Sequence, residues 1–223
     1  MKYIIETIYP EEERPLNLSP KKKQHFRGKA LRSKDPKQIY DYLTHYPDDE
    51  FMKKALKEIG DPVWIYDYLT HYPNDEFMKD ALKEIGDPVW IYCYLEEHPN
   101  DEDMKKALEK TRNAEWIYRY LEKYPNDEDM KKALEKTRNA EWIYYYLGKH
   151  PDDEDMKKAL EKTRNARYIY LYLYWINENN KDEKMKQALI NTGNIHYISD
   201  YLTFIDSEDE NMKKAYNELE SQT

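Results

Sequence analysis

Apolar residues recur along this chain in two alternating groups, each spaced as on one face of a helix. In the first group, Trp64, Ile65, Tyr68 and Leu69 fall within about 140° on a helical wheel. The second group, within residues 78–85, forms a narrower apolar stripe with helical spacing. Segments this short are not stable as isolated helices, so each must bury its stripe against neighbouring elements.

This pair of groups is a tandem repeat. The repeats begin near residues 35, 61, 87, 113, 139, 165 and 194. Each of the first five contains 26 residues, and the sixth contains 29 because the turn around 177–181 is longer. The seventh is more diverged and extends to the C-terminus. A regular period of this length is typical of helical repeats that stack on their neighbours.

Polar and proline residues mark the helix ends within each repeat. Asp61 is a good N-cap for a first helix, here called helix A, and Pro73 ends it because the residue before proline disfavours helical geometry. Asn74 or Asp75 then caps a second helix, helix B, and Gly86 suits its C-terminal cap. The pattern predicts an all-α fold, an αα-hairpin solenoid of about seven repeats spanning 35–223.

The two ends of the chain differ from the repeated middle. Gln38 stands where the next four repeats have tryptophan, and the polar C-terminus also suits a capping repeat. The basic segment 1–34 is expected to form an N-terminal cap. Its start, MKYIIETIY, suggests an extended strand, and Ser19-Pro20 begins a predicted helix.

The order of an apolar run, then HPND or YPND, then an ALKEIGDP step into the next helix resembles the leucine-rich variant repeats. The resemblance covers about residues 35–215. It implies a curved, right-handed superhelix. Some members of that family carry an iron–sulfur cluster on a cysteine-rich segment, but this chain has one cysteine, so that property is not carried over.

Composition narrows the class of protein. Charged residues make up 36% of the chain, but 23 Tyr and 5 Trp argue against disorder and for an elongated fold. One cysteine makes no internal disulfide or zinc cage, and no apolar run is long enough to span a membrane. No signal peptide is evident. We therefore expect an intracellular, cytoplasmic protein without cofactor or metal.

The net charge of −9 is unevenly distributed. Residues 1–34 carry nine basic and four acidic side chains, and the remainder carries a net charge of −14. The basic side chains of the predicted N-terminal helix include Lys21, Lys22, Lys23, Arg27, Lys29 and Arg32. They could hold nucleic acid phosphates, or they could pair with the acidic body. The acidic body itself could instead mimic a nucleic acid.

No combination of residues indicates catalysis. The acidic turns lack the central glycine and distal glutamate of a calcium loop, so they are interpreted as helix caps. The histidines lie in separate repeats without a metal-binding pair. Cys93 occupies a variable helix position, so it is expected to be exposed, and no histidine is placed to activate it. An enzyme is not expected.

One tyrosine recurs at the same place in helix A of six repeats. The positions are Tyr40, Tyr66, Tyr92, Tyr118, Tyr144 and Tyr170. It lies outside the main apolar stripe. It could pack between adjacent repeats, or it could line a groove that stacks bases or grips a peptide.

The clearest departure from the repeat lies in the fifth and sixth repeats, where normally polar positions become apolar. The candidate partner-binding residues are Tyr145, Leu171, Tyr174 and Trp175, with Arg119 in the neighbouring repeat. Exposed apolar groups flanked by polar surface are typical of binding sites. Alternatively, the longer turn could fold over them as a local core.

We therefore expect a non-enzymatic protein–protein interaction module, an adaptor or scaffold. Near-identical neighbouring repeats suggest recent copying, as in surfaces of phage or host-interaction proteins. The alternatives are an acidic nucleic-acid mimic and a protein that binds nucleic acid through its basic N-terminal segment.

Overall fold

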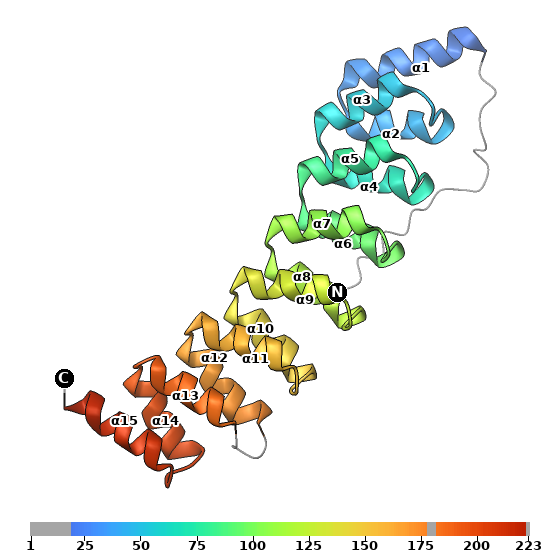
Figure 1. The fold of residues 1–223 in the computed structure, drawn as a ribbon. Helices are drawn as coiled ribbons and strands as arrows, with labels where there is room; N and C mark the ends of the chain where they lie inside the picture. The colour runs from blue at the N-terminus through green and yellow to red at the C-terminus, as the bar shows by residue number, and fades with distance from the viewer. Residues whose placement is uncertain (1–18, 178–181, 222–223) are drawn as a thin grey trace. The chain divides into compact units, whose positions relative to one another are not determined.

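The computed structural model describes residues 19–177 and 182–221, and these form fifteen α-helices and one π-helical segment with no strand (Figure 1). Two compact parts make up the chain, Met1–His98 and Pro99–Thr223. Within each part, helices follow one another as antiparallel pairs that pack on the next pair. The prediction of an all-α αα-hairpin solenoid with a period near 26 residues is confirmed.

The first part contains an N-terminal helix followed by two complete hairpins and helix A of the third repeat. Its elements are α1 (Pro20–Ser33), α2 (Pro36–His45), α3 (Glu50–Ile59), α4 (Pro62–His71), α5 (Glu76–Ile85) and α6 (Pro88–Glu97). Helix α2 packs on α3 and on α4, and α4 packs on α5 and on α6. Helices α2 and α4 thus each contact both their own helix B and the next helix A.

The second part continues the same pattern from helix B of the third repeat. Its elements are α7 (Glu102–Thr111), α8 (Ala114–Lys123), α9 (Glu128–Thr137), α10 (Ala140–Lys149), α11 (Glu154–Thr163), α12 (Ala166–Leu171), η1 (Tyr172–Ile176), α13 (Glu183–Asn191), α14 (Ile195–Phe204) and α15 (Glu210–Glu220). Consecutive helices A and consecutive helices B pack directly on one another.

The helix ends form where the sequence predicts them. The Asp61 carboxylate accepts a hydrogen bond from the Val63 amide at 3.0 Å, and Asp75 accepts one from the Met78 amide at 3.1 Å. These side chains satisfy amides that have no partner within the helix. Gly86 ends α5 in the left-handed region at φ 69°, which glycine adopts without strain.

A continuous line of apolar side chains holds each part together. Ile65 and Leu69 of α4 and Met78 and Leu82 of α5 are fully buried, and the equivalent residues of the other repeats are buried as well. Burying side chains of this size stabilises each hairpin by about 1.5–3 kcal/mol per residue. The apolar stripes identified in the sequence are therefore the core.

The basic N-terminal segment provides the predicted helix. Helix α1 packs on α2 and α3, with Ala30 buried and Phe26 against Tyr42 at a ring distance of 5.5 Å. Helix α1, and not the first hairpin, is therefore the terminal element of the described chain at this end. The predicted extended segment MKYIIETIY lies outside the described residues.

Helix A of the sixth repeat differs from the others because it continues from α12 into the π-helix η1. Five earlier repeats have proline at the turn, which has no amide to donate, whereas the sixth has Asn177. The Asn177 amide donates to the Tyr172 carbonyl at 3.0 Å, a bond across five residues. The Asp206 amide makes the same bond to Tyr201 at 3.1 Å in the seventh repeat, which also lacks the proline.

Candidate partner-binding surface

Four exposed aromatic side chains stand on consecutive helices A of the second part. Tyr145 on α10 is 43% exposed, Tyr174 and Trp175 on η1 are 41% and 67% exposed, and Phe204 on α14 is 63% exposed. We call these four residues the aromatic surface. Helix α10 packs on η1, and α12 packs on α14, so the helices that carry the four residues are neighbours.

Two residues of the aromatic surface stand on the π-helix. The rings of Tyr174 and Trp175 lie 4.7 Å apart and nearly perpendicular, at 87°. Tyr174 also stacks on Tyr170 at 5.9 Å. The positions of this pair are helical in the preceding repeat as well, because α10 ends at Lys149, the equivalent of Trp175, and η1 continues one residue further to Ile176. Single π-helical turns occur frequently at functional sites.

Three neighbouring aromatic rings pack near the Tyr145 ring. Its ring lies 5.4 Å from Trp142, 5.6 Å from Tyr144 and 6.4 Å from Tyr118. These contacts hold the side chain while 43% of it stays exposed. A pre-positioned aromatic side chain loses little conformational entropy when a partner covers it.

Arg119 and Leu171 occupy the same helix A position as Tyr145 in the repeats before and after it. Arg119 is exposed; it forms an ion pair with Glu115 at 2.8 Å and lies 4.9 Å above the Trp116 ring. Leu171 is half-buried, so it contributes less apolar surface than the aromatic residues do.

The alternative that the longer turn folds over these residues depends on residues 178–181, which lie outside the described residues. In the part of the chain that the structure describes, Trp175 keeps two thirds of its surface exposed. The described residues therefore do not enclose it in a local core.

Sequence reasoning did not include Phe204. This residue stands one repeat beyond Trp175 at the same position of helix A, where earlier repeats have His45, His71 or Lys149. The repeat that begins near residue 194 aligns Phe204 with Trp175, but its sequence has diverged from the others, so the equivalence was missed. With Phe204, the aromatic positions extend over three consecutive repeats.

Gly148 lies between Tyr145 and Lys149 inside α10 and is exposed. A methyl group built on Gly148 would meet no heavy atom within 4 Å, so packing does not require glycine here. The equivalent positions of other repeats hold larger residues, including Glu122 and Tyr174. Because glycine has no side chain, no side-chain atoms project from α10 at this position beside Tyr145.

The recurring tyrosine that could have lined a groove packs between repeats instead. The Tyr40 ring lies 5.3 Å from Trp64, and the Tyr118 ring lies 5.3 Å from Trp142, in each case across one repeat boundary. Tyr40 and Tyr118 are less than 10% exposed. This geometry favours the packing interpretation.

A buried polar contact between repeats was not anticipated from the sequence. The Tyr68 hydroxyl donates to Asp75 at 2.8 Å, and the Lys53 ammonium of the preceding repeat donates to the same carboxylate oxygen at 2.9 Å. The Tyr68 hydroxyl also lies 3.3 Å from the Pro47 carbonyl. We call this group the Tyr–Asp–Lys contact.

The Tyr–Asp–Lys contact recurs along the chain. Equivalent groups, by tyrosine, aspartate and lysine, are Tyr120, Asp127 and Lys105; Tyr146, Asp153 and Lys131; Tyr172, Asp182 and Lys157; and Tyr201, Asp209 and Lys186. Arg27 of α1 takes the place of the lysine beside Asp49 and Tyr42.

The charge state of this contact follows from its surroundings. Burial alone would raise the pKa of Asp75, but hydrogen bonds from Lys53, Tyr68 and the Met78 amide hold that pKa below its usual value. Burial, and then the neighbouring carboxylate, raises the pKa of Tyr68. The aspartate is thus ionised and the tyrosine neutral at pH 7, as a charge-assisted hydrogen bond requires.

The basic side chains of α1 are of two kinds. Arg27 pairs with Asp49, with its Nη2 at 3.0 Å from Oδ1, and lies 4.8 Å from the Phe51 ring; Lys23 lies 4.2 Å above Tyr46. Lys21, Lys22, Lys29 and Arg32 are exposed. At least two of the six candidate phosphate-binding residues therefore fix α1 to the first hairpin.

The expectation that Cys93 is exposed was wrong. The thiol is half-buried, and burial together with nearby carboxylates raises its pKa to about 11. A thiol with a raised pKa is a poor nucleophile at neutral pH.

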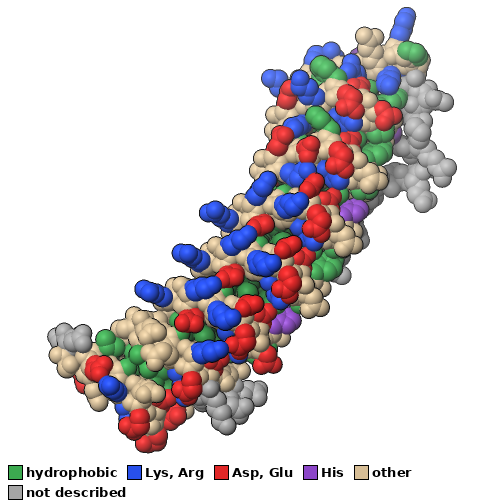
Figure 2. All heavy atoms as spheres, viewed as in Figure 1, with side chains coloured by type: hydrophobic (Ala, Val, Ile, Leu, Met, Phe, Trp, Pro, Cys, Tyr) green, Lys and Arg blue, Asp and Glu red, His purple; other side chains and the backbone are tan. Residues whose placement is uncertain are grey.

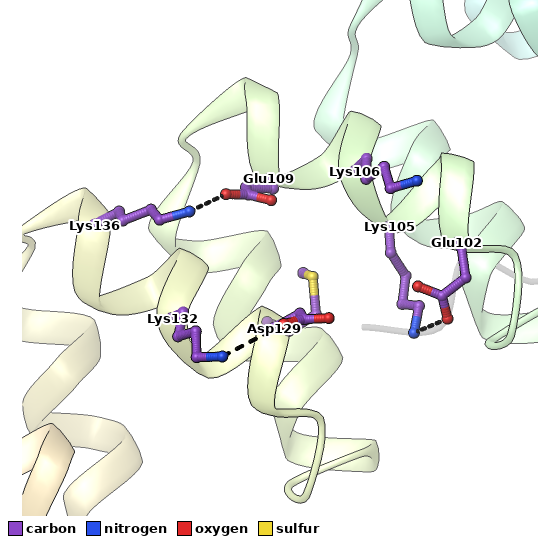
Figure 3. Close-up of a pocket in the computed structure, with 8 residues that line it drawn as sticks. Glu102, Lys105, Lys106, Glu109, Asp129, Lys132 and Lys136 are labelled. Atoms are coloured by element: carbon purple, nitrogen blue, oxygen red, sulfur yellow. Dashed lines mark hydrogen bonds and ion pairs between the residues drawn. The ribbon is translucent and has the colours of Figure 1, made fainter.

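A hollow between α7 and α9 is lined almost entirely by charged side chains (Figure 3). Lys136 pairs with Glu109 at 2.6 Å, Lys105 with Glu102 at 2.5 Å, and Lys132 with Asp129 at 3.7 Å. Charges paired in this way provide no excess of either sign for a ligand.

Among the described residues no cluster of histidine, cysteine and carboxylate groups could hold a metal, and no helix is long and apolar enough to cross a membrane.

No protein-family model, curated protein or solved structure matches this chain. The repeated helix pairs therefore establish a helical repeat without naming its type, and the resemblance to leucine-rich variant repeats remains a prediction.

Proposed function

We propose that this protein is a non-enzymatic protein-binding module whose aromatic surface anchors a protein partner. The observation that carries the proposal is the exposure of Tyr145, Tyr174, Trp175 and Phe204 on neighbouring helices of the second part. Tryptophan and tyrosine contribute most of the binding energy at many protein interfaces, because they bury a large area with few rotatable bonds.

The surroundings of the aromatic surface support a protein partner. The exposed Arg119 stacks on Trp116 one repeat before Tyr145, and arginine is also enriched at interface centres. Gly148 leaves room for another chain to approach α10 beside Tyr145. Repeat proteins commonly keep their framework constant and vary such surface positions.

The test replaces three of the four residues of the aromatic surface with residues that other repeats already hold at the same positions. The variant carries Tyr145→Arg, Tyr174→Thr and Trp175→Lys, which copy Arg119, Thr70 and Lys149. Because these residues occupy equivalent helices in the same chain, we expect the variant to fold with unchanged helical content.

The matched control is Phe51→Asp, which removes an exposed aromatic side chain of the first part and copies Asp103. Native lysate is passed over each protein with and without nuclease. We expect the same nuclease-resistant protein to bind wild type and the control, and to be lost with the triple variant. Retention by the triple variant and release by moderate salt would instead support binding through the acidic body or the basic segment.

A further inference from the structure

Three arginines occupy a backbone conformation that normally favours glycine. Arg112, Arg138 and Arg164 follow helices α7, α9 and α11 with φ of 53°, 54° and 54°. The first two hairpins place Gly60 and Gly86 at this position, with φ of 72° and 69°. A side chain with a Cβ atom is strained in the left-handed region, whereas glycine is not. Backbone strain that recurs in this way is found at functional sites.

The favourable interaction of cations with helix C-termini does not explain why arginine occupies these positions. A basic residue near the last turn interacts favourably with the helix dipole, but Lys110, Lys136 and Lys162 already stand there. The arginines lie outside the helices and add a further cation at each helix end. Glycine would cap each helix with less strain, as Gly60 and Gly86 do.

The three guanidinium groups are available to a ligand. Arg112, Arg138 and Arg164 are exposed, and among the described residues none of them forms an ion pair. Nearby lysines differ in this respect: Lys106, Lys132 and Lys158 pair with Asp103, Asp129 and Asp155 at 3.4, 3.7 and 3.1 Å.

Arg112, Arg138 and Arg164 lie in consecutive repeats, along one edge of the second part. Helix α7 packs on α9, and α9 packs on α11, so equivalent residues of these repeats are separated by about 10 Å. In Figure 2, basic side chains project at regular intervals along the edge where the connections between these repeats lie, and acidic side chains gather toward the edge with the turns.

We propose that Arg112, Arg138 and Arg164 form a binding edge for an acidic polypeptide segment, with each guanidinium holding one carboxylate. Arginine binds a carboxylate through two parallel N–H donors. An extended chain rises about 3.3 Å per residue, so carboxylates about three residues apart match the spacing of the arginines.

The local charges favour a polypeptide over a nucleic acid. Glu115 and Glu141 lie three residues beyond Arg112 and Arg138, in the first turn of α8 and α10. A nucleic acid strand carries a phosphate at every nucleotide and would bring charges close to these carboxylates. A polypeptide can place acidic residues opposite the arginines alone.

The test measures binding of a fluorescent peptide, with glutamate at every third residue and glycine or serine between, to the full chain by anisotropy at low ionic strength, where exposed ion pairs are least screened. A chain with a net charge of −9 repels a polyanion in general, so binding requires a local cationic site. One variant carries Arg112→Gly, Arg138→Gly and Arg164→Gly. The control carries Lys106→Gln, Lys132→Gln and Lys158→Gln, which removes the same charge from the same repeats.

We expect the wild type and the lysine control to bind, and the arginine variant to bind at least about tenfold more weakly. The arginine variant should unfold at the same or a higher temperature, because glycine relieves the strain, so that unfolding does not explain the loss. No binding by the wild type, undiminished binding by the arginine variant, or equal loss in both variants would overturn the proposal. Tighter binding of single-stranded DNA of equal charge, lost in the arginine variant, would overturn the choice of a polypeptide.

Discussion

The Tyr–Asp–Lys contact predicts a large cost for one substitution in the second part, Asp127→Ala. The Asp127 carboxylate accepts hydrogen bonds from the Met130 amide at 3.1 Å and the Tyr120 hydroxyl at 3.1 Å, and it pairs with Lys105 at 3.1 Å. The carboxylate and the ammonium are only 15% and 14% exposed. Alanine removes all three contacts at once.

The magnitude follows from the three contacts. Loss of an N-cap costs about 1 kcal/mol, and loss of a hydrogen bond to a charged acceptor costs about 1.5 kcal/mol. A partly buried lysine left without its partner adds about 1 kcal/mol, less than a fully buried one would. We expect Asp127→Ala to lower the free energy of unfolding by about 3.5 kcal/mol. Asp127→Asn, which still caps the helix, should lower it by about 1–2 kcal/mol.

The assay is urea unfolding followed by circular dichroism, with hydrogen exchange to locate the loss of protection. We expect exchange to rise most in α8 and α9, because neighbouring repeats stabilise one another. Asp129→Ala is the control, since Asp129 lies in the same helix turn with its side chain 81% exposed. If Asp127→Ala and Asp129→Ala differ by less than about 0.5 kcal/mol, the buried contact does not stabilise the repeat boundary as reasoned here.

Two other substitutions or conditions test the same physical account. Gly148→Ala should raise the free energy of unfolding by about 0.5–1 kcal/mol, because the added methyl group meets no atom within 4 Å and alanine favours the helix; lower stability in thermal unfolding would show a hidden contact. Acid should destabilise the chain through its buried aspartates. The pKa values of Asp75, Asp127 and Asp209 are held below the usual 3.8 despite burial, so their contribution is complete above that pH and is lost as the pH falls below it. Urea unfolding between about pH 5 and pH 2 measures this loss, and Asp127→Asn should show a smaller one; equal losses would contradict the assignment.

Helix positions could be predicted because each depends on residues close in sequence. Asp61 caps α4, and the residue before Pro73 ends the helical geometry, without help from the rest of the fold. The apolar stripes likewise follow from helical spacing alone. Among the described residues, the π-helix η1 was not predicted, because its formation depends on the Asn177 amide reaching a carbonyl five residues earlier.

The contacts between repeats could not be predicted in the same way. Lys53 and Asp75 are 22 residues apart, and their meeting depends on the angle at which one hairpin packs on the next. The half-buried position of Cys93 has the same origin, because Tyr66 of the preceding repeat lies close enough to interact electrostatically with it. Tyr, Asp and Lys recur in successive repeats of the sequence, but only the packed structure shows that they contact one another.

The aromatic surface could be predicted in part from the sequence. Tyr145, Tyr174 and Trp175 could be identified because they depart from the repeat, and their exposure agrees with that identification. The half-buried state of Leu171 and the continuation of the surface to Phe204 depended on the packing of α12 and α14.

The most direct test of the proposed function is photo-crosslinking from position 175. A photoreactive phenylalanine analogue replaces Trp175 in one protein and the exposed His71, at the same helix position of an early repeat, in another. We expect one protein partner from native lysate to crosslink at position 175 and not at position 71, with or without nuclease. Crosslinking of the same products at both positions, or of nucleic acid alone, would contradict a protein-binding role for the aromatic surface.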